Sequence, residues 1–214
     1  MKIIQVDLNK DYREAIEAAC RILRLGGTVV YPTDTVYGLG ANACDHLATE
    51  QIFKVKNRPY HKPLPVIVRN LEWVEAVAFV DDRNKKVLQS IWPGTTTAIL
   101  PKRDHLSSLV MAGGMTVGIR IPNFAFTDQL LGKFGYPLTA TSANLSGEEA
   151  TNDINKIIKR FENAKYRPSL IIDAGILPKS KPSTVLDLAS DEPKILRVGP
   201  TRPDQLIKLL ENMR

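Results

Sequence analysis

Short apolar segments rich in β-branched residues alternate with amphipathic helical segments along this chain. This alternation constrains the fold more than any other feature, because strands that alternate with helices build α/β sheets. We expect strands over residues 3–6, 28–32, 65–68, 95–100, 116–121, 137–140, 169–173, 183–188 and 194–198. We expect helices over residues 11–27, 46–56, 70–78, 81–91, 125–134, 152–164 and 203–213. Some strands are joined too closely for crossover connections, which predicts a mixed sheet in one α/β domain over residues 1–214.

Local signals predict several of the boundaries. The first long helix should stop at Gly26–Gly27, and the second must end before Pro59, because the residue before proline avoids the α region. Thr151 is the expected N-cap of the helix over 152–164. We expect a loop over residues 33–42, "TDTVYGLGAN", between the second strand and the second helix.

Composition limits where such a chain can reside. No stretch approaches the length of about 18 apolar residues that a spanning helix needs, and the first residues do not form a signal peptide. Cys20 and Cys44 are the only cysteines, and two unclustered cysteines make neither a disulfide framework nor a metal site. We therefore expect a cytoplasmic protein in a reducing compartment, without membrane contact.

One stretch is unusually basic. The segment "KVKNRPYHKPLP", residues 54–65, is rich in cations and prolines and contains no acid. The wider acid-free window from 51 to 71 holds five cations, which account for five of the six units of net positive charge. The segment is either a solvated basic loop or a rigid cradle for phosphate, nucleotide or RNA. Lys54 and Arg69 fit the first interpretation better.

Small hydroxyl residues follow or precede several expected strands. They occur in "YPTDTVYG", in "TATSANLSG" and in "KPSTVLD", whereas the usual glycine-rich phosphate-binding signatures are missing. Ligands of open α/β sheets bind in crevices at strand ends. Hydroxyl and backbone N–H groups there can hold phosphate oxygens without a dominant charge.

Seven motifs together carry a resemblance. "GGTVVYPTDTVYGLG", "IFKVKNRPYHKPL", "WPGTTTAIL", "VGIRIP", "TSANLSG", "PSTVLD" and "ILRVG" follow one another from about residue 26 to 199. In this order they resemble the YrdC/TsaC family. The resemblance implies a single α/β domain whose twisted open mixed sheet is flanked by helices and borders a concave, positively charged cavity.

The resemblance also implies an enzyme, a nucleotidyltransferase that acts in tRNA processing. Such an enzyme makes threonylcarbamoyl-AMP from L-threonine, bicarbonate or CO2 and ATP, and it releases pyrophosphate. ATP would enter with Mg2+ as its cofactor, held through the phosphates and not by protein side chains. The product would pass to a partner threonylcarbamoyl transferase that modifies adenosine in tRNA, and direct tRNA contact is a further expectation. Without a nucleophile paired to a histidine, no covalent enzyme intermediate is expected.

Individual residues carry over by position in the motifs. Those that would bind the nucleotide are Lys56, Arg58, Tyr60, Thr116, Ser142, Asn144 and Arg197, of which Lys56 and Arg58 would also be catalytic. Those that would bind L-threonine are Thr33, Arg120, Ala140 and Ser183. A guanidinium offers several donors to phosphate oxygens, a lysine adds a point charge, and the nearby prolines limit the backbone that carries them.

Two positions depart from the family pattern. Many members carry a histidine where this chain has Ile67, and a proline is common where it has Thr141. We also do not expect the extra C-terminal domain that longer members carry. Two other classes remain open. One is a module that binds double-stranded RNA or tRNA without turnover. The other is a family relative with nucleotide hydrolase or carbamoyl-transfer chemistry.

Overall fold

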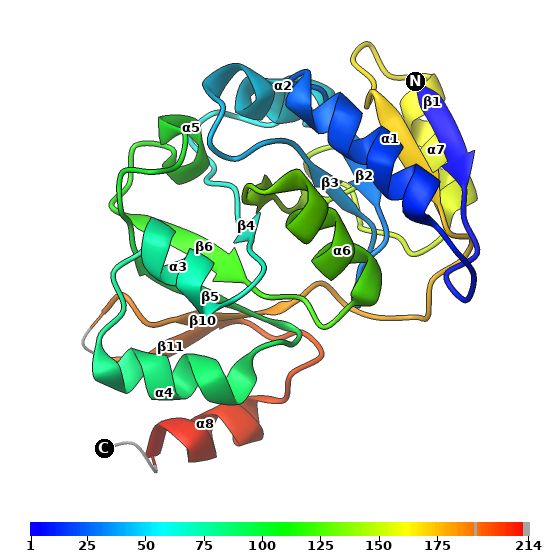
Figure 1. Cartoon of the computed structure of the whole chain (residues 1–214). Helices are drawn as coiled ribbons and strands as arrows, with labels where there is room; N and C mark the ends of the chain where they lie inside the picture. Colours follow the sequence, from blue (N-terminus) through cyan, green and yellow to red (C-terminus); the bar gives the residue numbers. More distant parts are fainter. Residues whose placement is uncertain (191, 212–214) are drawn as a thin grey trace.

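The strands form two mixed sheets instead of the single sheet expected, although the α/β class is confirmed. A computed structural model describes residues 1–190 and 192–211. We name the five-stranded sheet sheet A and the six-stranded sheet sheet B. In Figure 1, sheet A lies at the upper right and most of sheet B at the lower left.

Sheet A contains both parallel and antiparallel pairs. Its order is β1 (Lys2–Gln5), β9 (Leu170–Asp173), β2 (Val29–Tyr31), β3 (Gly38–Gly40) and β8 (Thr141–Ser142). The first three run parallel, whereas β2–β3 and β3–β8 are antiparallel. The expected loop over 33–42 therefore contains a buried strand. A β-carbon at Gly40 would lie 2.5 Å from the Thr139 carbonyl oxygen, so only glycine allows this close approach.

Helices cover both faces of sheet A. One face packs on α1 (Arg13–Arg24) and α6 (Ala125–Phe134), and the other on α2 (His46–Lys56) and α7 (Ile154–Glu162). Val29 faces the first pair of helices and Val30 the second, because successive side chains of a strand point to opposite faces. Sheet A is thus the middle layer of a three-layer arrangement.

Sheet B has a different environment on each face. Its order is β11 (Lys194–Arg197), β10 (Thr184–Asp187), β5 (Thr96–Pro101), β6 (Thr116–Arg120), β4 (Val66–Ile67) and β7 (Leu138–Thr139). Ala98 and Ile119 face an apolar core that also contains residues of helices α3 (Leu71–Val77), α4 (Asp82–Ile91), α5 (Ser108–Met111) and α8 (Pro203–Glu211). Thr97 and Arg120 alternate with these positions and therefore point to the opposite face.

The chain passes from one sheet to the other at Ala140. Thr139 is the last residue of β7 in sheet B, and Thr141 is the first residue of β8 in sheet A. The Ala140 amide donates to the Pro65 carbonyl at 2.8 Å, which holds the crossing against the segment before β4. This crossing brings the strand ends of both sheets close together.

The start of α7 differs from the one expected, and the expected end of α8 falls on residues that the structure does not describe. Asp153, and not Thr151, is the N-cap of α7: its carboxylate accepts from the Asn155 amide at 3.0 Å. The Thr151 hydroxyl instead accepts from the Asp153 amide at 3.2 Å and so supports the cap from outside the helix. Helix α8 is described to Glu211, and the rest of the stretch expected to residue 213 lies outside the described residues.

None of the helices described in residues 1–190 and 192–211 combines the length and the apolar character needed to cross a membrane.

Candidate active site

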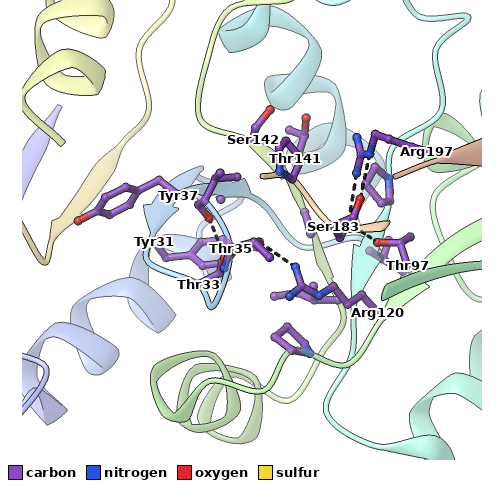
Figure 2. Close-up of a pocket in the computed structure, with 18 of the residues that line it drawn as sticks. Tyr31, Thr33, Thr35, Tyr37, Thr97, Arg120, Thr141, Ser142, Ser183 and Arg197 are labelled. Carbon is purple, nitrogen blue, oxygen red and sulfur yellow. Dashed lines mark hydrogen bonds between the residues drawn. The ribbon is translucent and has the colours of Figure 1, made fainter. Parts of the chain in front are cut away.

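A cavity of about 220 Å³ lies where the strand ends of the two sheets converge (Figure 2). The predicted site residues that line it are Thr33, Arg58, Arg120, Ala140, Ser142, Ser183 and Arg197. They come from segments up to 164 positions apart in the chain, so only the fold brings them together. Ile67 and Thr141, where the sequence departs from the family pattern, line the same cavity.

Arg120 is anchored at the end of β6 by three different partners. Its Nη2 donates to the Asp34 carboxylate at 2.6 Å, its Nη1 to the Thr35 hydroxyl at 2.9 Å and its Nε to the Gly94 carbonyl at 2.8 Å. The other Asp34 oxygen accepts from the Asn123 amide at 3.1 Å. Burial lowers the pKa of Arg120, and the adjacent Asp34 carboxylate opposes that shift. The side chains of Arg120 and Asp34 are only 8% and 12% exposed, so solvent screens this ion pair little.

Two threonines outside the predicted set, Thr35 and Thr97, contribute hydroxyls to the cavity. Thr35 accepts from Arg120, and its hydroxyl lies 3.1 Å from that of Thr33. Thr97 of β5 lies 2.8 Å from the Ser183 hydroxyl, oxygen to oxygen. The signal that could have found Thr97 is its position in an expected strand between Thr96 and Ala98, where a buried polar side chain needs a partner.

Arg197 and Ser183 meet at the edge of sheet B. Arg197 Nε donates to the Ser183 carbonyl at 2.9 Å, and its Nη2 donates to the Ser183 hydroxyl at 3.2 Å (Figure 2). Burial lowers the pKa of Arg197. Gly199 permits this geometry, because a β-carbon there would lie 2.3 Å from the Pro182 carbonyl oxygen. The strand that carries Arg197 can therefore approach Ser183, which immediately precedes β10.

The basic stretch resolves into cations in different environments. Helix α2 ends at Lys56, and Asn57 takes the left-handed conformation at its C-cap. Arg58 then turns into the cavity wall, and its guanidinium donates to the Pro63 carbonyl at 2.8 Å. Burial lowers the pKa of Arg58. Lys54 pairs with Glu50, and Arg69 pairs with Asp128, so both lie in ion pairs outside this cavity.

Lys56 is almost completely buried, with 2% of its surface exposed. Its Nζ lies 2.5 Å from the Ser142 carbonyl oxygen, 2.7 Å from the Asn144 carbonyl oxygen and 3.2 Å from Asn144 Oδ1. Burial, with smaller contributions from the charges of Arg58 and Arg160, lowers the pKa of Lys56 to about 7. Lys56 and Asn144 therefore lie together behind the cavity, and neither is among the residues that line it.

Tyr60 and Thr116 do not reach the cavity wall. The Tyr60 ring stacks on Phe53 at 4.8 Å between centroids, and its hydroxyl lies 3.3 Å from a Glu50 oxygen, so the side chain faces away. Thr116 begins β6, four residues before Arg120, and is exposed. At about 3.3 Å per residue, roughly 13 Å of strand separates the two positions. The motif spacing alone did not show which end of this strand meets the cavity.

The cavity contains three arginines, and none of its described lining residues is acidic. Among the described residues, no group of three or more His, Cys, Asp or Glu side chains is placed to hold a metal ion. The wall thus combines guanidinium groups with hydroxyls from Thr33, Ser142 and Ser183. In class, this is an α/β protein with a cavity of arginine and hydroxyl side chains between two mixed sheets.

The comparison with known families gives a direct match over most of the chain. The Sua5_yciO_yrdC family, described as "Telomere recombination", matches residues 21–199. The chain therefore belongs to the Sua5/YciO/YrdC family, which confirms the resemblance that the seven motifs indicated.

Named relatives and solved structures agree with this assignment. The threonylcarbamoyl-AMP synthase of Bacillus subtilis is 36% identical over 193 residues, which cover 89% of this chain and 55% of that protein. Pyrococcus abyssi Sua5 complexed with L-threonine gives a TM-score of 0.91 at 31% identity, covering 98% of this chain and 61% of that one. Escherichia coli YciO gives a TM-score of 0.82 at 30% identity, covering 94% and 96%. The first two relatives extend well beyond the part that this chain matches.

The Asp34→Asn substitution tests the buried ion pair. Removing the carboxylate charge leaves the Arg120 guanidinium buried without its counter-ion, and the free energy of unfolding should fall by about 3 kcal/mol. Urea denaturation followed by tryptophan fluorescence measures this loss. Asp128→Asn is the matched control, because it breaks the exposed pair with Arg69 and should have a much smaller effect. Equal losses in the two variants would contradict the importance of the Asp34–Arg120 pair.

The lowered pKa of Lys56 predicts a pH dependence of stability. Between about pH 7 and about pH 10.5, the unfolded chain holds a proton on Lys56 that the folded chain has largely lost. The free energy of unfolding therefore increases as the pH rises through this range. The stability of the wild type relative to Lys56→Met should rise by about 2–3 kcal/mol between about pH 7 and about pH 9. Urea denaturation of both proteins across this range measures it, and a difference independent of pH would contradict the shift.

Proposed function

We propose that the chain makes threonylcarbamoyl-AMP from L-threonine, bicarbonate and ATP, for the modification of adenosine in tRNA. The observation that carries this proposal is the convergence of Arg58, Arg120 and Arg197 with hydroxyl groups in one cavity between the sheets. The similarity to the Bacillus subtilis synthase and to Pyrococcus abyssi Sua5 complexed with L-threonine supports it. Both relatives are longer than the matched region, so the activity of this chain needs its own test.

The proposed reaction needs positioning more than covalent help. The amine of threonine takes up bicarbonate, with loss of water, to form a carbamate. A carbamate oxygen then attacks the α-phosphorus of ATP, the bond to the β-phosphate oxygen breaks, and pyrophosphate leaves with its electron pair. Arg58, Arg197 and Ser142 line the cavity and, in this proposal, contact the phosphate oxygens, where cations offset the charge that develops in the transition state. Holding both reactants in one cavity supplies the remaining rate enhancement, because the reacting atoms are then already close and aligned.

A second group of lining residues suits the amino acid. Thr33, Ala140 and Ser183 offer hydroxyl and backbone groups, and Arg120 offers a guanidinium near them. Three of the five N–H donors of Arg120 serve its protein partners, so two are left for a substrate carboxylate. The anchoring of Arg120 fixes the direction of those two donors.

The residues that line the cavity indicate how Mg2+ would be held. Mg2+ prefers oxygen ligands such as carboxylates, and the described lining residues include no Asp or Glu. We therefore treat Mg2+ as part of the MgATP substrate, held by the phosphates. It would supply additional positive charge at the phosphates. Arg58 and Arg197 would orient the phosphate oxygens by hydrogen bonds from the cavity wall.

Product formation is the direct test of the function. Wild-type protein mixed with ATP, Mg2+, L-threonine and bicarbonate should yield threonylcarbamoyl-AMP, detected by mass spectrometry, together with pyrophosphate. Arg58→Ala should lower kcat/KM by about 10–100-fold, because it removes a charge-assisted phosphate contact. Lys62→Ala is the control from the same loop and should retain activity, since the Lys62 side chain is exposed and is not among the residues that line the cavity.

Other outcomes identify the alternatives. ATP breakdown that does not require threonine would indicate a family relative with hydrolase chemistry. RNA binding without any turnover would indicate a binding module. Near-wild-type activity of Arg58→Ala, with the melting temperature unchanged, would exclude the assigned role of Arg58.

A further inference from the structure

Lys56 is the most deeply buried cation at the edge of the candidate site, and its surroundings are unusual. All three oxygens within hydrogen-bond distance of its Nζ belong to one short segment, Ser142 to Asn144. In its charged form the Lys56 amine has three N–H donors, so these three acceptors match its full capacity. The side chain therefore ties the end of α2 to this segment across 86 positions of sequence.

Asn144 extends the same network. Its Oδ1 accepts from the Ser142 hydroxyl at 2.5 Å as well as from Lys56. Its Nδ2 donates to the Leu145 carbonyl at 3.0 Å and to the Glu148 carbonyl at 2.6 Å. The Ser146 amide donates back to the Lys56 carbonyl at 2.8 Å. We name residues 142–148 the SAN loop; Lys56 and Asn144 hold its conformation from inside.

Ser142 is the member of this network that reaches the cavity. It lies in β8, opposite Gly38 of β3, and the adjacent Ala143 amide donates to the Tyr37 carbonyl at 2.9 Å. The backbone of Ser142 is thus fixed by sheet A on one side and by Lys56 on the other. The direction of its hydroxyl depends on Asn144 Oδ1, and the position of that oxygen depends in turn on Lys56.

The charges around Lys56 agree with a structural role. Arg58 and Arg160 bring positive charge near its Nζ, and Glu148 brings negative charge from the SAN loop itself. Glu148 also forms an ion pair with Arg160 of α7. A direct contact between Lys56 and a phosphate would require Nζ to give up loop oxygens that it already binds within a buried environment.

We propose that Lys56 is a positioning residue, which fixes the SAN loop and through it the Ser142 hydroxyl at the cavity wall, without contacting the nucleotide. The consequence for turnover rests on the proposed function, in which Ser142 contacts a phosphate. The consequence for the loop does not, because the contacts are present in the protein without a ligand.

The first experiment measures hydrogen exchange in the ligand-free protein. In Lys56→Met, amides of the SAN loop should exchange at least about tenfold faster than in the wild type, and the melting temperature should fall. Lys54→Met is the matched control: it removes one lysine from the same helix, whose side chain pairs with Glu50, and loop exchange should stay unchanged. Unchanged loop exchange in Lys56→Met would overturn the proposal, whether or not the protein proves to be a synthase.

The second experiment asks whether donors or charge matter at position 56. Lys56→Gln keeps two N–H donors but loses the positive charge. A positioning role predicts that this variant recovers part of the loop protection and part of the ATP affinity lost in Lys56→Met. A direct phosphate contact predicts that both variants lose ATP affinity equally while loop exchange stays at the wild-type level. Because Gln is a milder change, it also provides the answer if Lys56→Met fails to fold.

The third experiment uses a double-mutant cycle in kcat/KM. If Lys56 acts through Asn144, the double variant Lys56→Met/Asn144→Ala should lose no more activity than Lys56→Met alone. Fold-losses that multiply would show that the two residues act independently and would overturn the coupling. If the wild type makes no product, the proposed function fails, and the exchange measurements still decide the role of Lys56.

Discussion

The buried ion pair between Arg120 and Asp34 is the interaction on which the cavity depends most. Arg120 ends a strand of sheet B, and Asp34 lies in the loop that follows a strand of sheet A. The same guanidinium also holds Thr35 and the Gly94 carbonyl, so one side chain joins three segments around the cavity. A buried charge is costly unless it is paired and hydrogen-bonded, and this requirement fixes the relative positions of the two sheets there.

The crossing at Ala140 makes such a cavity possible. A chain that leaves β7 in sheet B and enters β8 in sheet A after one residue must hold the two sheet edges close together. Glycine at position 40 accommodates this proximity, since a β-carbon would collide with the Thr139 carbonyl. The hydroxyl-rich segments seen in the sequence therefore meet because they follow strands whose ends converge.

Part of the candidate site could be predicted from sequence, and the limits have physical causes. Arg58 and Ser183 were selected by motif position, and both line the cavity. Tyr60 was selected in the same way, but it faces the outside of the molecule because its ring packs on Phe53 of the preceding helix. Thr97 was missed because its role depends on the pairing of β5 with β10, which brings it to Ser183. A motif specifies how far apart its residues lie along the chain, whereas a binding site also requires that their side chains point into the same cavity.

The sequence by itself determined the α/β class, most strand and helix positions, the family and the segments that carry site residues. These depend on periodicity, turn residues and motif order, which are local or linear properties of the chain. Only the tertiary structure decided that the strands divide into two sheets, that Asp34 pairs with Arg120 and that Lys56 is buried behind the cavity. Each of these depends on which distant segments pack together in the interior of the protein. Every buried charge and hydrogen-bond donor there needs a partner, and the order of residues along the chain does not specify that partner.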